Sequence, residues 1–137
     1  MDEDLVVWND SYSVGFTPMD DQHKKLVDII NSLLWSCRGG NSVSKTDSML
    51  SFSKASEYAL THFRAEEEYM KKAAFPDIDS HKKEHENFLA EVKSAFKKYQ
   101  ESDSAPIDLA IYLKKWLLNH IAVIDKKYTP YLAKLQQ

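Results

Sequence analysis

The 137-residue sequence has little of what builds disulfide-stapled, β-rich or membrane-spanning proteins. It contains one cysteine, three glycines and four prolines, so a disulfide pair is excluded and few tight turns are available for an all-β fold. No apolar run approaches the roughly 20 residues that a membrane-spanning helix needs. Cys37 falls on an apolar helical stripe and is expected to be a buried, inert thiol. We therefore expect one all-α globular domain over residues 1–137, without membrane insertion.

The chain also lacks a large excess of either positive or negative charge. The net charge is −3 and the pI about 5.9, with lysines and glutamates interspersed, so the chain has no basic patch for nucleic acid or an anionic membrane. The acidic start, MDEDLVVWND, lacks the basic region and apolar core of a secretory signal. We expect a cytoplasmic, monomeric protein.

Apolar residues instead recur with a helical period. In the first such segment they are Leu26, Val27, Ile30, Leu33 and Leu34. The pattern predicts an N-terminal arm over residues 1–18 and four helices, at about 20–37, 45–73, 80–100 and 106–128. Because the connections are short, neighbouring helices are expected to run antiparallel, as an up-down-up-down four-helix bundle.

Polar and turn-forming residues mark the expected helix ends. The glycines of RGGNS end the first helix, and Ser44 is positioned to cap the second. Asp79 or Ser80 is expected to cap the third helix. Pro106 stands where the first turn of the fourth helix tolerates proline.

The five histidines fall at one end of this bundle. Each lies on the inner face near a helix end, and the antiparallel order brings these ends together: His23, His62, His81, His85 and His120. Burying them without partners would cost about 1–3 kcal/mol for each unsatisfied group. A metal would satisfy them together, so the sequence predicts a metal site.

Two carboxylates are candidates to join the histidines. Glu66 follows His62 by four residues, about 40° around the helix, whereas Glu67 and Glu68 lie about 140° and 240° away and are expected to be solvated. Asp125 follows His120 by five residues, about 140° in a regular α-helix. If both are ligands, the helix must be widened locally by a π-type bulge. Otherwise Asp125 is solvated at a frayed end or reaches the site from beyond the helix.

Four motifs together resemble those of the hemerythrins, specifically the single-domain bacterial members: YSVGFTPMDDQHKKL, HFRAEEEYM, HKKEHENF and WLLNHIAVIDKKY. The resemblance implies a non-haem centre of two iron ions joined by an oxo or hydroxo bridge. His81, His85 and His120 would hold one iron, and His23 and His62 the other. Glu66 and Asp125 would bridge both.

This ligand set fills all but one position of two octahedra, and the open position lies on the iron with two histidines. The resemblance implies that dioxygen binds there reversibly, in a carrier, a store or a supplier to an oxygen-consuming enzyme, and not in an enzyme. The apolar wall of the pocket is expected to include Phe63, Trp116, Leu117 and Ile121, which would exclude water and anions. Core packing alone would also place these residues inside.

Other metal proteins compete with this interpretation. Ferritin-like di-iron oxidases use Glu-x-x-His motifs, which the sequence lacks. Structural zinc prefers four tetrahedral ligands, fewer than the set predicted here. A di-iron enzyme or scavenger acting on peroxide or nitric oxide, or an oxygen sensor, would need the same site and stays open.

Overall fold

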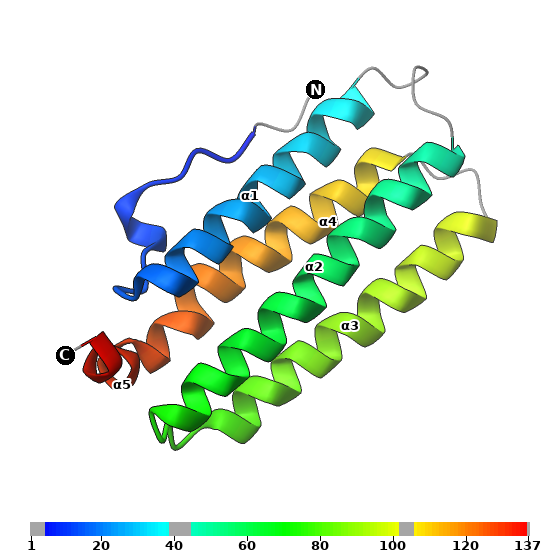
Figure 1. The fold of residues 1–137 in the computed structure, drawn as a ribbon. Helices are drawn as coiled ribbons and strands as arrows, with labels where there is room; N and C mark the ends of the chain where they lie inside the picture. The colour runs from blue at the N-terminus through cyan, green and yellow to red at the C-terminus, as the bar shows by residue number, and fades with distance from the viewer. Residues whose placement is uncertain (1–4, 39–44, 102–105, 137) are drawn as a thin grey trace.

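Four long helices run side by side and alternate in direction (Figure 1). The computed structural model describes residues 5–38, 45–101 and 106–136, and within these ranges the regular structure is entirely helical. The long helices are α1 (Thr17–Arg38), α2 (Lys45–Lys72), α3 (Ile78–Glu101) and α4 (Pro106–Asn119). Each contacts two others, α1 with α2 and α4, and α3 with α2 and α4, so they enclose one core. The expected four-helix bundle is confirmed.

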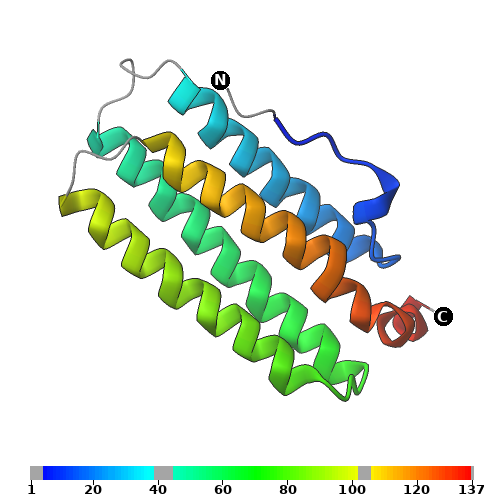
Figure 2. The ribbon, with the colours of Figure 1, turned by 180° about the vertical axis from the view of Figure 1, so that it is seen from behind.

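The chain continues past α4 through four short helical segments. They are the π-helix η2 (His120–Ile124), the 3-10 helix η3 (Asp125–Tyr128), α5 (Thr129–Leu132) and the 3-10 helix η4 (Ala133–Gln136). Figure 2 shows them from behind, extending beyond the end of α4. The predicted single α-helix over 106–128 is therefore α-helical only to Asn119. In the described part of the chain, no helix combines the length and apolar character needed to cross a membrane.

Two of the helices begin earlier than predicted. The first helix begins at Thr17 rather than at residue 20, because Pro18 fits a first helical turn. The third begins at Ile78, and the backbone N–H of His81 donates to the carbonyl oxygen of Asp77. Asp79 and Ser80 therefore lie inside the first turn, and the prediction that either caps this helix was wrong. Ser44 and the side chain of Cys37 lie outside the described residues.

From residue 5 onward, the N-terminal arm runs beside α1 (Figure 1) and is hydrogen-bonded to it at two places. Asn31 accepts a hydrogen bond from the backbone N–H of Val6 at 2.7 Å and donates to the Val6 carbonyl at 2.9 Å. Nearer the C-terminal end of the arm, Asp20 of α1 accepts hydrogen bonds from the backbone N–H of Val14 at 2.8 Å and from the hydroxyl of Ser13 at 2.6 Å. Gly15 has a φ of +70°, a conformation that favours glycine at this turn.

Buried apolar residues form two clusters. The larger fills the bundle between the four long helices and includes Phe63 and Ile121. The smaller lies where the arm and the C-terminal segments meet the bundle and includes Met70, Phe75 and Tyr128. The predicted metal-binding side chains lie between these two clusters and make ring contacts with both, which places them in a dry environment.

Candidate metal centre

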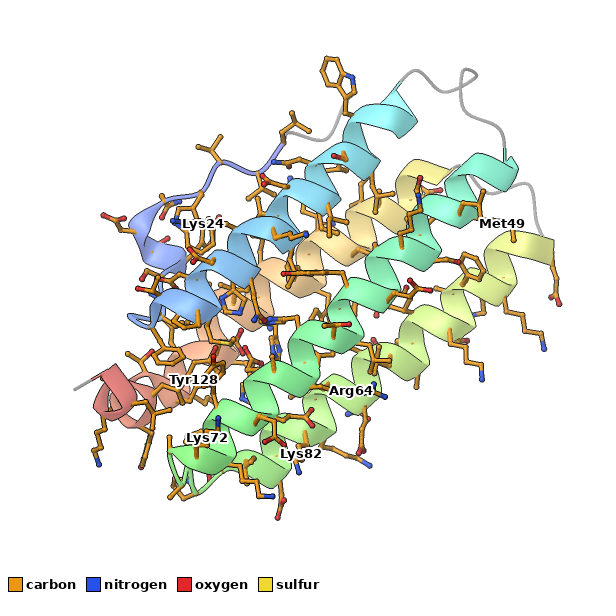
Figure 3. The ribbon with its side chains drawn as sticks, viewed as in Figure 1. Lys24, Met49, Arg64, Lys72, Lys82 and Tyr128 are labelled. Atoms are coloured by element: carbon orange, nitrogen blue, oxygen red, sulfur yellow. The ribbon has the colours of Figure 1, made fainter. Side chains whose placement is uncertain are left out.

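Seven buried side chains with polar or charged groups gather at one level of the bundle, and none is more than 3% exposed. They come from α1, α2, α3 and the segment after α4, and they are His23, His62, Glu66, His81, His85, His120 and Asp125. Tyr128, labelled in Figure 3, lies inside the same end of the bundle. The structure thus brings together all seven residues that the sequence singled out as ligands.

Glu66 divides its two oxygens between two groups of histidines. Its Oε2 lies 3.3 Å from Nε2 of His23 and 3.4 Å from Nε2 of His62. Its Oε1 faces the other group, 3.0 Å from Nε2 of His81 and 2.9 Å from Nε2 of His85. A carboxylate oriented in this way can contact one ion through each oxygen.

Asp125 shows the same division. Its Oδ2 lies 3.0 Å from Nε2 of His23, and its Oδ1 lies 2.9 Å from Nε2 of both His81 and His120. Within each of two groups, the possible ligand atoms lie within 4.8 Å of one another. The first group is Glu66, His81, His85, His120 and Asp125, and the second is His23, His62, Glu66 and Asp125. Both carboxylates belong to both groups.

A π-helix brings Asp125 to this position. The backbone N–H of Asp125 donates to the carbonyl of His120, five residues earlier, across η2. One extra residue in this turn moves Asp125 onto the face that His120 occupies. The predicted π-type bulge is confirmed. Asp125 is fully buried, so the alternative of a solvated residue at a frayed helix end was wrong. Asp125 also follows η2 directly within the helical run, so the alternative that it reaches the site from beyond the helix was wrong as well.

Hydrogen bonding within the chain does not satisfy this cluster. Nε2 of His85 and Nε2 of His120 lie 3.1 Å apart, so one of the two must carry a proton to donate to the other. Among the described residues, both oxygens of Asp125 and the Nδ1 atoms of His23 and His120 have no hydrogen-bond partner. Such buried groups are costly unless something else satisfies them.

The spacing of the ligand atoms suits metal ions. A metal–imidazole bond is about 2.0–2.1 Å long, so two ligands at right angles around one ion lie about 3 Å apart. The Nε2–oxygen distances of 2.9–3.0 Å to Asp125 match this spacing. Five imidazole nitrogens with two carboxylates suit iron and other first-row transition metals. The residues present therefore fit two metal ions with shared carboxylates.

The electrostatics of the cluster favour cations. Burial lowers the pKa of His23, but the adjacent carboxylates of Asp125 and Glu66 outweigh this effect and raise the pKa to about 9. Burial likewise opposes the charge on His120, but Asp125 raises its pKa to about 10. Burial also disfavours the ionised carboxyls of Glu66 and Asp125, yet the surrounding histidines hold both pKa values well below their usual range. The anionic carboxylates thus attract protons or metal ions to the same nitrogens.

Three hydrogen bonds at the site were not predicted from the sequence. Oε1 of Gln22 lies 2.7 Å from Nδ1 of His62, and Oε2 of Glu67 lies 2.8 Å from Nδ1 of His85. The hydroxyl of Tyr128 donates to Oε2 of Glu66 at 2.8 Å. The expectation that Glu67 is solvated was wrong, because its side chain is only 26% exposed. The only sequence signal for Gln22 and Tyr128 was that each lies close in sequence to a predicted ligand, Gln22 to His23 and Tyr128 to Asp125.

Aromatic rings pack directly on the histidines. Phe63 stacks on His85 with ring centroids 3.9 Å apart and planes 9° apart. Trp116 stacks on His120 at 4.5 Å and 13°. A cavity of about 30 Å³ adjoins them and is lined by Phe63, Trp116 and Leu117 together with other apolar side chains. Ile121 is fully buried but is not among the residues that line the cavity.

Comparison with known proteins adds an independent finding. Residues 14–132 match the family model described as the hemerythrin HHE cation binding domain. Bacteriohemerythrin of Methylococcus capsulatus is 31% identical over 122 residues, covering 88% of this chain and 89% of the relative. A hemerythrin-like protein of Naegleria gruberi is 33% identical over 121 residues, covering 88% of each. A crystal structure of wild-type hemerythrin superposes with a TM-score of 0.83 at 28% identity and covers 95% of this chain and 99% of that chain.

Proposed function

The chain belongs to the hemerythrin family, and from this premise we propose that it binds dioxygen reversibly at a non-haem di-iron centre, as a carrier, store or supplier of oxygen. The observation that carries the proposal is the division of each carboxylate between two groups of histidines. Oε1 and Oε2 of Glu66 face different histidines, and so do Oδ1 and Oδ2 of Asp125. Two acids shared in this way can bridge a pair of adjacent ions.

The two groups supply different numbers of ligands. His81, His85 and His120 would hold one iron and His23 and His62 the other, with Glu66 and Asp125 bridging both beside an oxo or hydroxo ion. Two bound irons would supply an open coordination position and the electrons for reversible uptake of dioxygen. The open position would lie on the side of His23 and His62, where one fewer histidine is present.

The remaining residues orient the ligands and keep the site dry. Phe63 and Trp116 cover the faces of His85 and His120, which limits the rotation of both rings. Tyr128 holds Oε2 of Glu66 through its hydroxyl. Leu117 lines the adjoining cavity and is 6% exposed, so it helps to exclude water and anions from the metals.

We propose a binding protein rather than an enzyme because of the charge of this ligand set. Five neutral imidazoles and two carboxylates place less negative charge on the metals than the four carboxylates of ferritin-like oxidases. Less negative charge gives less support to highly oxidised iron. Reversible binding is therefore favoured over oxidation of a substrate.

Anaerobic reduction followed by admission and removal of oxygen tests this proposal. Protein purified without added metal should contain about two irons per chain, and a visible absorption band should appear with oxygen and disappear on its removal over repeated cycles. One or two zinc ions in place of iron would overturn the proposal. A single irreversible change to the oxidised form would show that the protein is not a carrier.

A further inference from the structure

We propose that Glu67 is a positioning residue of the metal centre, which fixes the tautomer of His85 and, through it, stabilises the oxidised state of the iron on the three-histidine side. This inference rests on the proposed di-iron function. It concerns a residue that contacts no metal itself but acts through the ring of His85. Its basis is the contact between Glu67 and Nδ1 of His85, the ring nitrogen that points away from the cluster.

Both nitrogens of His85 are engaged. Nδ1 lies 2.8 Å from Oε2 of Glu67, and Nε2 lies 2.9 Å from Oε1 of Glu66. A carboxylate oxygen only accepts hydrogen bonds, so Nδ1 must carry the proton. When Nε2, which faces Oε1 of Glu66 and the centre of the cluster, gives its lone pair to a metal, the one remaining ring proton stays on Nδ1, where Glu67 accepts it. Glu67 thereby selects the tautomer that ligation requires.

The ring is also held in place mechanically. Glu67 lies on α2 and His85 on α3, so their hydrogen bond joins the two helices beside the site. Phe63 stacks on the ring with planes 9° apart. With its plane and both nitrogens fixed, His85 can present Nε2 in only one direction. The ligand is therefore oriented before a metal arrives.

The other group of histidines has a neutral counterpart. Nδ1 of His62 lies 2.7 Å from the amide oxygen of Gln22. Among the described residues, Nδ1 of His23 and of His120 has no hydrogen-bond partner. The side chains behind the cluster thus place an anion on the three-histidine side and an uncharged amide on the two-histidine side.

This difference in charge has an electronic consequence. A carboxylate that accepts from Nδ1–H makes the imidazole a more basic ligand. It also adds a negative charge beside the iron, which favours the more positive, oxidised state. Gln22 has no such charge. Glu67 therefore makes the iron on the three-histidine side easier to oxidise, while the iron with the open position keeps a less donating ligand set.

Glu67→Gln is the informative variant because it keeps the length and a hydrogen-bond acceptor but removes the charge. Glu68→Gln is the matched control, since it removes the same charge from the next residue, whose side chain is exposed. Glu67→Ala removes both the charge and the acceptor. Each variant is compared with the parent for iron content and by a spectroscopically monitored redox titration.

We expect Glu67→Gln to bind two irons per chain and to shift the ratio of reduced to oxidised centre at a fixed potential by about tenfold toward the reduced form. This is the lower end of the roughly 10–100-fold effect on metal affinity or activity when an outer-shell partner is lost. Glu68→Gln should shift the ratio less than twofold. Equal shifts in the two variants would overturn the electronic role, because charge lost anywhere on this face would then suffice.

Nitrogen-15 NMR of the metal-free protein provides a readout that needs no iron. Nδ1 of His85 should carry a proton in the parent, in Glu67→Gln and in Glu68→Gln, and should lose it in Glu67→Ala, where only Nε2 still faces a carboxylate. A proton retained on Nδ1 in Glu67→Ala would overturn the positioning role. If the parent bound no iron, the proposed function would fail on its own, and the NMR comparison would still decide whether Glu67 positions His85.

Discussion

The backbone N–H of Asp125 donates to the carbonyl oxygen of His120, and this single five-residue hydrogen bond places the two side chains on one face. Nε2 of His120 lies 2.9 Å from Oδ1 of Asp125 as a result. A regular α-helical turn would have separated them by about 140°. The widened turn is costly to the helix, and such turns recur at functional sites.

Asp125→Asn should therefore weaken the binding of both irons, because the variant keeps the shape of the side chain but removes a charge that faces both groups of histidines. Iron content per chain and chelator competition provide the measurement. Asp108→Asn removes the same charge from an exposed position of α4 and should change neither. Two tightly bound irons in Asp125→Asn would show that Asp125 is not a bridge.

Substitution of one histidine from each group should have different effects. His62→Ala should weaken one iron site and abolish dioxygen binding, because it removes a ligand from the iron with the open position. His85→Ala should damage mainly the other iron. Iron analysis and the oxygen-dependent absorption band distinguish the two. If His85→Ala kept two tight irons and the oxygen affinity of the parent, the assignment of ligands to irons would be wrong.

Leu117→Ala should speed the loss of the oxygen-bound form by autoxidation, because it enlarges the cavity beside the aromatic rings and admits water. The rate is measured from the decay of the absorption band under oxygen. Leu34→Ala is the control, since it truncates a buried leucine that does not line the cavity. Each variant should lose about 2–5 kcal/mol of folding free energy. Equal autoxidation in both would reduce Leu117 to a packing role.

Tyr128→Phe should lower iron affinity about tenfold, because it frees Oε2 of Glu66 while leaving a ring to pack against His81. The cost in folding free energy should be about 1 kcal/mol, the net value of one hydrogen bond. Chelator competition and chemical denaturation measure the two effects. Tyr131→Phe, at a half-buried position nearby, should leave iron affinity unchanged. Parent-like affinity in Tyr128→Phe would show that the phenol does not hold the bridge.

The metal-free protein should lose stability as the pH rises from about 6.5 to 10. The pKa of His23 is about 9 and that of His120 about 10 in the folded protein, above the ordinary value of about 6.5. The folded state therefore binds these protons more tightly than the unfolded state does. Their contribution is fully present below pH 6.5 and is lost as the pH rises through 9 and 10.

Thermal melting of the metal-free protein at several pH values measures this loss. His23→Gln should show a smaller decrease over the same range, because it removes one of the raised pKa values. Iron-loaded protein should also show a smaller decrease, since metal rather than protons would then occupy the nitrogens. A melting temperature that stays constant or rises from pH 6.5 to 10 would contradict the prediction.

Much of the fold and of the candidate site follows from local spacing. Apolar periodicity predicts four helices, and short connections make them antiparallel. Every histidine near a helix end is then carried to the same level, which is why His23 and His120 could be grouped from the sequence. The five-residue interval from His120 to Asp125 even predicts the widened turn, because a helix has a fixed rotation per residue.

What only the tertiary structure decided is how side chains on different helices face one another. The helical period places Glu67 about 140° from His62, which suggested that its side chain faces solvent, but the period says nothing of what lies at that angle. There α3 brings His85 within 2.8 Å. In the same way, only the packing of four helices decides which oxygen of Glu66 faces which histidine. Rotation about one helix is encoded locally, whereas the distance between two helices depends on how all the side chains between them pack.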